Sequence, residues 1–85
     1  MTSIERDMAQ RLSRCSFLPG SNDKRFAAKM GAISVLNAKG QECDEAKRIT
    51  KAQLLELRRL FYKYRRQIGY ATVYRIQQKD ERNGA

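Results

Sequence analysis

The chain has 85 residues, of which 41% are hydrophobic and 32% are charged, a composition typical of one small globular domain. Lysine and arginine outnumber aspartate and glutamate by 18 to 9, so the net charge is +9 at pH 7. The absence of histidine excludes Ser-His and Cys-His catalytic pairs. No apolar run approaches the roughly 18 residues that a membrane-spanning helix needs, so we expect no membrane-embedded segment.

The N-terminal residues predict an amphipathic helix over about residues 3–14. Thr2 and Glu5 have the spacing of a capping box, in which each side chain bonds to the backbone amide of the other residue. Apolar side chains then recur every three or four residues, as one face of a helix requires: Ile4, Met8, Leu12 and Cys15. The segment has acids early and no apolar signal core, so we expect a cytoplasmic protein.

A turn at Gly20 and an N-cap at Ser21 predict a second helix over about residues 22–36. Its apolar face consists of Phe26, Ala27, Met30 and Ile33. Gly31 weakens the second half, because glycine costs about 1 kcal/mol relative to alanine inside a helix. An extended exit over residues 33–35 is therefore an alternative to the last helical turn.

The segment over residues 37–49 is polar and mixed in charge, with Gly40 as a helix breaker, and we predict a loop. Cys43 lies in this loop, whereas Cys15 lies on the apolar face of the first predicted helix. Two cysteines without a histidine or a CxxC pair match no zinc-binding pattern. We expect neither a metal nor a cofactor.

Residues 50–69 carry the longest helical pattern. Thr50 and Gln53 form a second capping-box pair, and Gly69 is a natural C-cap. The apolar positions between them form one continuous stripe on a helical wheel: Leu54, Leu57, Leu60, Phe61, Tyr64 and Ile68. This stripe predicts the side that packs into the core. The same spacing also fits a coiled-coil seam, so a homodimer is the alternative.

The opposite side of this predicted helix is cationic. Residues 47–66 contain eight lysines and arginines against Glu56 alone. Arginine binds phosphate through two parallel hydrogen bonds, and an exposed tyrosine can stack on a base. We therefore interpret this face as a nucleic-acid-binding site formed by Lys51, Arg58, Arg59, Tyr62, Lys63, Arg65 and Arg66. A basic face that only keeps the protein soluble is the alternative.

Beyond the predicted C-cap, residues 70–76 predict either a short fourth helix or a packed extension. We expect the polar residues 77–85 to form a disordered tail. The chain is thus predicted to be all-α: one domain over residues 1–76 with three helices, or four, followed by the tail.

Two blocks of the sequence resemble a known group of proteins: CSFLPGSNDKRFAAKM over residues 15–30 and LLELRRLFYKYRRQIG over residues 54–69. The FLPGS–KRF block followed by a helix that ends in YRRQ resembles short, poorly characterised proteins of phages, prophages and other mobile elements. The resemblance implies a bacterial host cell, and a protein that either binds nucleic acid or binds and inhibits a host protein. It implies no active site.

No arrangement of residues indicates catalysis, so we expect a binding protein and not an enzyme. The leading hypothesis is a DNA- or RNA-binding helical module of low sequence specificity, because nothing in the sequence indicates a code for base edges. The alternative is a protein-binding factor that docks its basic face on an acidic surface of a host protein, with Leu55 and Tyr62 as apolar anchors. The loop over residues 37–49 is far longer than the turn of about three or four residues in a helix-turn-helix, which argues against that motif.

Overall fold

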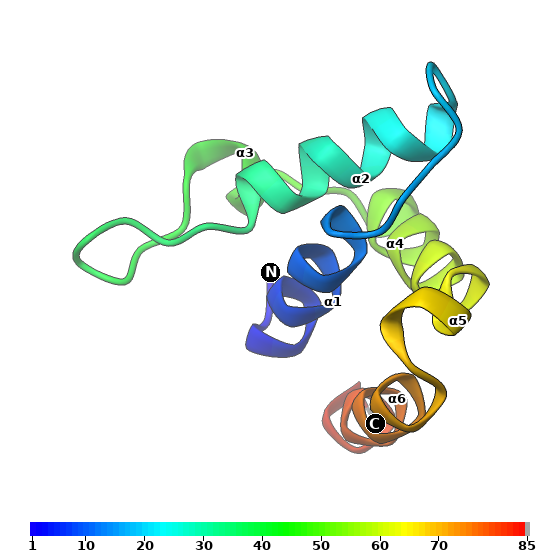
Figure 1. Ribbon diagram of the computed structural model, residues 1–85. Coiled ribbons are helices and arrows are strands. Elements are labelled where there is room, and N and C mark those ends of the chain that lie inside the picture. The colour runs from blue at the N-terminus through cyan, green and yellow to red at the C-terminus, as the bar shows by residue number, and fades with distance from the viewer. Residues whose placement is uncertain (85) are drawn as a thin grey trace.

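The computed structural model describes residues 1–84, which form six helices and no strand (Figure 1). The all-α prediction is confirmed, but the predicted number of helices was too low. No helix in this part of the chain is long and apolar enough to cross a membrane. In chain order the helices are α1 (Ser3–Ser13), α2 (Asn22–Ile33), α3 (Asp44–Lys47), α4 (Lys51–Lys63), α5 (Arg65–Ile68) and α6 (Tyr70–Gly84).

Side chains at the predicted positions start three of the helices. The hydroxyl of Thr2 accepts from the Glu5 amide at 3.1 Å, and Glu5 accepts from the Thr2 amide at 2.8 Å. Thr50 and Gln53 make the same reciprocal pair at the start of α4. The Ser21 hydroxyl caps α2 by accepting a hydrogen bond from the Lys24 amide. Each cap satisfies a backbone donor that the helix itself leaves free.

The core lies where α1 packs against α2, α4 and α6, with α1 in the centre of the view in Figure 1. Its buried side chains come from α1, α2, α4 and α6: Met8, Ala9, Leu12, Ala27, Met30, Ile33, Leu57, Leu60, Phe61, Val73 and Ile76. The predicted stripe of α4 therefore faces the core, with three of its members fully buried and the rest partly buried. The core interpretation of this stripe is thus the one that the structure supports.

The predicted loop after α2 contains one further helical turn. α2 ends at Ile33, and residues 34–36 are not helical. Gly31 lies inside the helix and does not mark its end. The loop reaches away from the other helices on the left of Figure 1 and returns to form α3. Ala46 of α3 is buried, which gives this short turn a packing contact that the polar sequence around it did not indicate.

The predicted helix over residues 50–69 is interrupted at Tyr64, where φ is −98° and ψ is 22°. Tertiary contacts hold the chain there. The Tyr64 hydroxyl donates to Asp23 at 2.8 Å, and one turn later the amide side chain of Gln67 bonds to both backbone groups of Ser16 at 2.7 and 3.0 Å. These long-range bonds lie at the junction of α4 and α5, where the sequence has no helix breaker.

Residues 77–84, which we expected to belong to a disordered tail, continue α6; Ala85 lies outside the described residues. The helix over residues 70–76 is confirmed, and it starts after Gly69, whose φ of 115° is a conformation that glycine adopts readily. The polar stretch stays helical next to the domain because Asp80 binds Arg58. A surface pattern of polar residues does not reveal such a contact.

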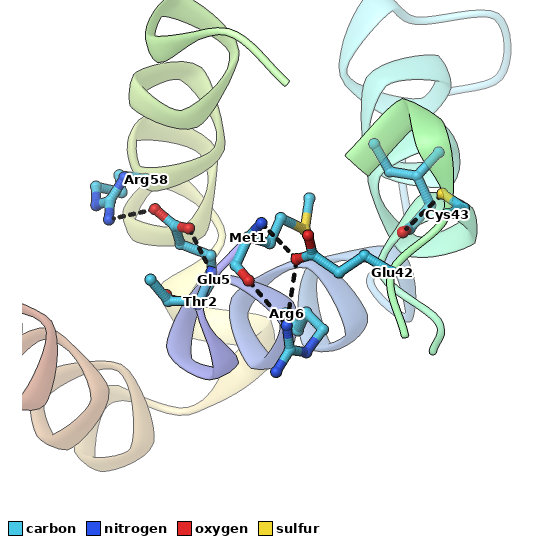
Figure 2. A network of polar contacts seen from close by, with 8 residues as sticks. Met1, Thr2, Glu5, Arg6, Glu42, Cys43 and Arg58 are labelled. Atoms are coloured by element: carbon cyan, nitrogen blue, oxygen red, sulfur yellow. Dashed lines mark hydrogen bonds and ion pairs between the residues drawn. The ribbon is translucent and has the colours of Figure 1, made fainter. Parts of the chain in front are cut away.

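Arg58 joins three helices through its guanidinium group. Its Nε and Nη2 atoms donate to the two carboxylate oxygens of Asp80 at 2.8 and 2.9 Å. The same Nη2 donates to Glu5 at 2.9 Å, a contact that Figure 2 shows beside the Thr2 cap. Glu5 is only 6% exposed, so its charge needs this partner. The carboxylates of Asp80 and Glu5 raise the pKa of Arg58 above its usual value.

A second polar network at the same end of α1 holds the loop that precedes α3. Glu42 accepts from the N-terminal amine of Met1 at 2.5 Å and from Arg6 at 3.3 Å, as Figure 2 shows. The bond to the ammonium group lowers the pKa of the Glu42 carboxyl. Arg6 also donates to the Met1 carbonyl at 2.8 Å, so these three residues form one connected cluster.

We predict that Arg58→Ala lowers the free energy of unfolding by about 2 kcal/mol, because it leaves the nearly buried Glu5 without a cation. Urea unfolding measures this loss, and amide hydrogen exchange of residues 77–84 should accelerate at the same time. Arg66→Ala removes an exposed arginine that has no carboxylate partner within residues 1–84, and it should change stability by less than about 0.5 kcal/mol. Equal stability of the two variants would contradict the role of Arg58.

Gly31→Ala should destabilise the protein, although alanine is the better helix former by about 1 kcal/mol. An added Cβ would lie 2.5 Å from the Cβ of Ser13 in α1, where the two helices approach closely. The expected cost is about 1–3 kcal/mol. The Ser13→Gly background should remove most of it in a double-mutant cycle of unfolding free energies, and a stabilising Gly31→Ala would show that the contact is absent.

Candidate functional site

The predicted cationic face divides into paired and unpaired side chains. Arg58 is held inside the fold as described above. Arg59 bonds to Glu56 at 2.6 Å within the helix, and the Lys63 ammonium bonds to Asp23 of α2 at 2.7 Å. Three of the predicted phosphate-binding cations therefore contact the chain's own carboxylates.

The pairs of Arg59 and Lys63 differ from that of Arg58 in their exposure. The side chains of Arg59 and Lys63 are more than half exposed, whereas that of Arg58 is mostly covered. Exposed ion pairs contribute little net free energy, typically about 0–1 kcal/mol. Arg59 and Lys63 can thus exchange their carboxylates for a phosphate at low cost, and Arg58 cannot.

Arg65 forms the centre of the unpaired part. Its guanidinium carbon lies 4.2 Å from the centroid of the Tyr62 ring and 5.9 Å from that of Tyr70. Its Nη1 also donates to the Tyr62 carbonyl at 3.0 Å. Within residues 1–84, neither Arg65 nor its neighbour Arg66 forms an ion pair with a carboxylate. Two cation–π contacts hold the guanidinium group at the surface without cancelling its charge.

Tyr70 and Tyr74 are site residues that the sequence analysis missed. They are 58% and 65% exposed, and they lie four residues apart on α6, on the same face of the helix. The YATVY spacing in the sequence places both tyrosines on one face of a helix. Their position next to Arg65 becomes apparent only from the packing of α6 against α5. We call the cluster of exposed rings and unpaired arginines the Tyr-Arg patch: Tyr62, Arg65, Arg66, Tyr70 and Tyr74.

A shallow groove of about 170 Å³ lies between α4 and α6, over Met8 of α1. Its walls are formed by Arg58, Phe61, Gln77, Asp80 and Glu81. Gln77 and Glu81 lie on the same face of α6 as Tyr70 and Tyr74, at spacings of three, four and seven residues. The groove contains the Arg58–Asp80 ion pair, whereas the two unpaired arginines of the patch lie in α5, outside its lining.

Lys51 is separate from the patch. It is exposed and unpaired among the described residues, but it begins α4, about 16 Å along the helix from Tyr62 at 1.5 Å per residue. The structure therefore brings together Tyr62, Arg65 and Arg66 from the predicted set. Lys51 extends the same side of α4 only as an isolated cation.

The described part of the chain contains no metal-binding cluster and no disulfide bond. Among residues 1–84, no group of three or more cysteine, aspartate or glutamate side chains is placed to hold a metal ion. Cys15 and Cys43 are both free thiols. Burial raises the pKa of Cys15, which disfavours its reactive thiolate form.

Comparisons with protein-family models, with curated proteins and with solved structures found no match to this chain. What the Tyr-Arg patch binds is therefore inferred from its own geometry and charge. The resemblance of residues 15–30 and 54–69 to mobile-element proteins stays a prediction.

The Asp23 carboxyl should titrate below its ordinary range, because hydrogen bonds from Lys63 and then Tyr64 lower its pKa. Its contribution to stability is present above the unfolded-state pKa of about 3.9 and is lost as the pH falls through the lower folded-state value. Lys63→Met should raise the Asp23 pKa, measured by the carbon-13 shift of the carboxyl during an NMR titration. An unchanged titration in this variant would argue against the pair in solution.

Proposed function

We propose that the protein is a nucleic-acid-binding helical module of low sequence specificity, which contacts phosphates through Arg65 and Arg66. The observation that carries this proposal is the position of these two arginines, unpaired among the described residues and next to three exposed tyrosines. Arginine without an internal carboxylate retains both hydrogen-bonding edges for a bidentate contact with a phosphate.

The surrounding charge supports an anionic ligand. Arg59 and Lys63 add two cations whose exposed pairs are weak enough to be exchanged. Lys51 continues the same side of α4 toward its start. Arg58 is excluded from this role, because a phosphate would have to displace two carboxylates and uncover Glu5. The proposed phosphate-binding set is thus smaller than the predicted one and lies closer to α5.

Low sequence specificity follows from the kind of side chains in the patch. Sequence is read by side chains that reach base edges with several donors and acceptors, typically from a helix in the major groove. The patch consists of arginines and tyrosines, and the nearby amide of Gln67 is occupied by Ser16. The loop between α2 and α4 is also too long for a helix-turn-helix reader.

A protein partner is the second candidate, favoured by one observation. Leu55 is 57% exposed and lies two helical turns before Tyr62 on the same row of α4. An exposed leucine beside tyrosine and arginine fits the composition of a protein-interface centre, and an acidic host protein would complement the charge. In either case we propose action in the cytoplasm of a bacterial host, as the mobile-element resemblance implies.

Charge reversal at Arg65 and Arg66 tests the proposed function. The double variant Arg65→Glu/Arg66→Glu should bind fluorescein-labelled DNA and RNA at least tenfold more weakly than the native protein. The slope of log K against log salt concentration, between about 50 and 200 mM, should become shallower by one to two. Both readouts come from fluorescence anisotropy.

The matched control is Lys29→Glu/Lys39→Glu, which changes the net charge equally at two exposed lysines on α2 and in the following loop. Equal losses in the two variants would show unlocalised attraction and contradict a binding face at the patch. Leu55→Ala separates the second candidate, because it should leave nucleic-acid binding unchanged and weaken only a protein complex.

A further inference from the structure

The three tyrosines of the Tyr-Arg patch are not equivalent. Arg65 lies over one face of the Tyr62 ring and bonds to the Tyr62 carbonyl, so this ring serves to position the guanidinium group. Tyr70 and Tyr74 are the two most exposed rings of the chain's described residues. No aromatic pair involves either of them in this part of the chain, and Arg65 lies over one face of the Tyr70 ring only, so the Tyr74 ring and the other face of Tyr70 are open to a ligand.

An open ring face beside an arginine suits a flat, uncharged group attached to an anion. A nucleobase linked to a phosphate has this combination, and stacking on an aromatic side chain is one of the main contributions in single-strand binding. In a duplex the faces of the bases are covered by their neighbours, and only base edges and backbone are accessible. Surface rings such as Tyr70 and Tyr74 can therefore stack only on unpaired bases.

The spacing of the two rings also favours an unpaired strand over a duplex. Residues four apart on a helix have Cβ atoms about 5–6 Å apart, whereas successive bases of one strand in a duplex rise about 3.4 Å. Two adjacent bases can each meet a ring only if their own stack has opened, as an extended single strand allows. Arg65 lies between the α4 and α6 sides of the patch, 5.9 Å from the Tyr70 ring, where it can reach the phosphate next to a stacked base.

We infer that the Tyr-Arg patch binds single-stranded nucleic acid, with neighbouring unpaired bases on Tyr70 and Tyr74 and their phosphates at Arg65 and Arg66. This inference rests on the proposed function and narrows it to one class of ligand. It also assigns Tyr62 a positioning role and removes Lys51 and Arg58 from direct contact with the stacked bases.

The chain contains its own probe for this contact. It has no tryptophan and four tyrosines, of which only Tyr64 lies outside the patch, hydrogen-bonded to Asp23. Tyrosine emission therefore reports mainly on Tyr62, Tyr70 and Tyr74. Titration with oligothymidylate of about 16 nucleotides, near the upper site size of small single-strand-binding folds, should quench this emission. A self-complementary duplex of equal nucleotide content should leave most of it unchanged.

Two tyrosine variants separate stacking from other roles. Tyr70→Ala/Tyr74→Ala should weaken oligothymidylate binding at least tenfold and change duplex binding by less than about twofold. Tyr70→Phe/Tyr74→Phe keeps both rings and should retain the native affinity. Both positions are exposed, so the variants should keep the native thermal midpoint. Leu18→Ala/Val35→Ala is the control, because it truncates two exposed apolar side chains that do not belong to the patch.

The outcomes distinguish the inference from the proposed function. Preference for the single strand that is lost only in the alanine variant supports the inference. Equal binding of single strand and duplex, unaffected by loss of the tyrosines but abolished by Arg65→Glu/Arg66→Glu, would overturn the inference and keep the proposed function. Binding of neither nucleic acid at about 50 mM salt would overturn both and leave a protein as the partner.

Discussion

The interaction on which the rest of the structure depends is the guanidinium group of Arg58 between Asp80 and Glu5. It connects α4 to the start of α1 and to the second half of α6, which are 53 and 22 residues away in the chain. Glu5 has a second function in the same place, because it completes the cap of α1. One arginine thus compensates a nearly buried acid and fixes the position of the last helix.

Because Arg58 binds carboxylates inside the fold, it also determines which side chains are exposed near α5. With α6 held against α1 and α4, its first turn lies next to α5, and Tyr70 comes within reach of Arg65. The fold therefore divides the basic side of α4 and α5 into one internal arginine, two weakly paired cations and an unpaired end. The Tyr-Arg patch exists only because these helices meet; none of them carries it alone.

Local sequence determined the features that depend on neighbouring residues. The capping boxes at Thr2 and Thr50 require partners three residues away, and the buried stripe of α4 requires only a regular spacing of apolar side chains. Both were predictable for this reason. The all-α class followed from them, and so did the side of α4 that carries the cations.

Tertiary structure decided everything that depends on distant partners. A helical wheel places Arg58 among the free cations, because it contains no information about Asp80 or Glu5. The same limit applies to polar residues 77–84, which have no apolar periodicity and whose contact with the domain includes the Asp80–Arg58 ion pair. It applies also to the break at Tyr64, whose side chain bonds to Asp23 of another helix. Charge pattern alone therefore located the basic side of the protein, whereas long-range ion pairs and helix packing selected which of its cations, and which tyrosines, remain available to a ligand.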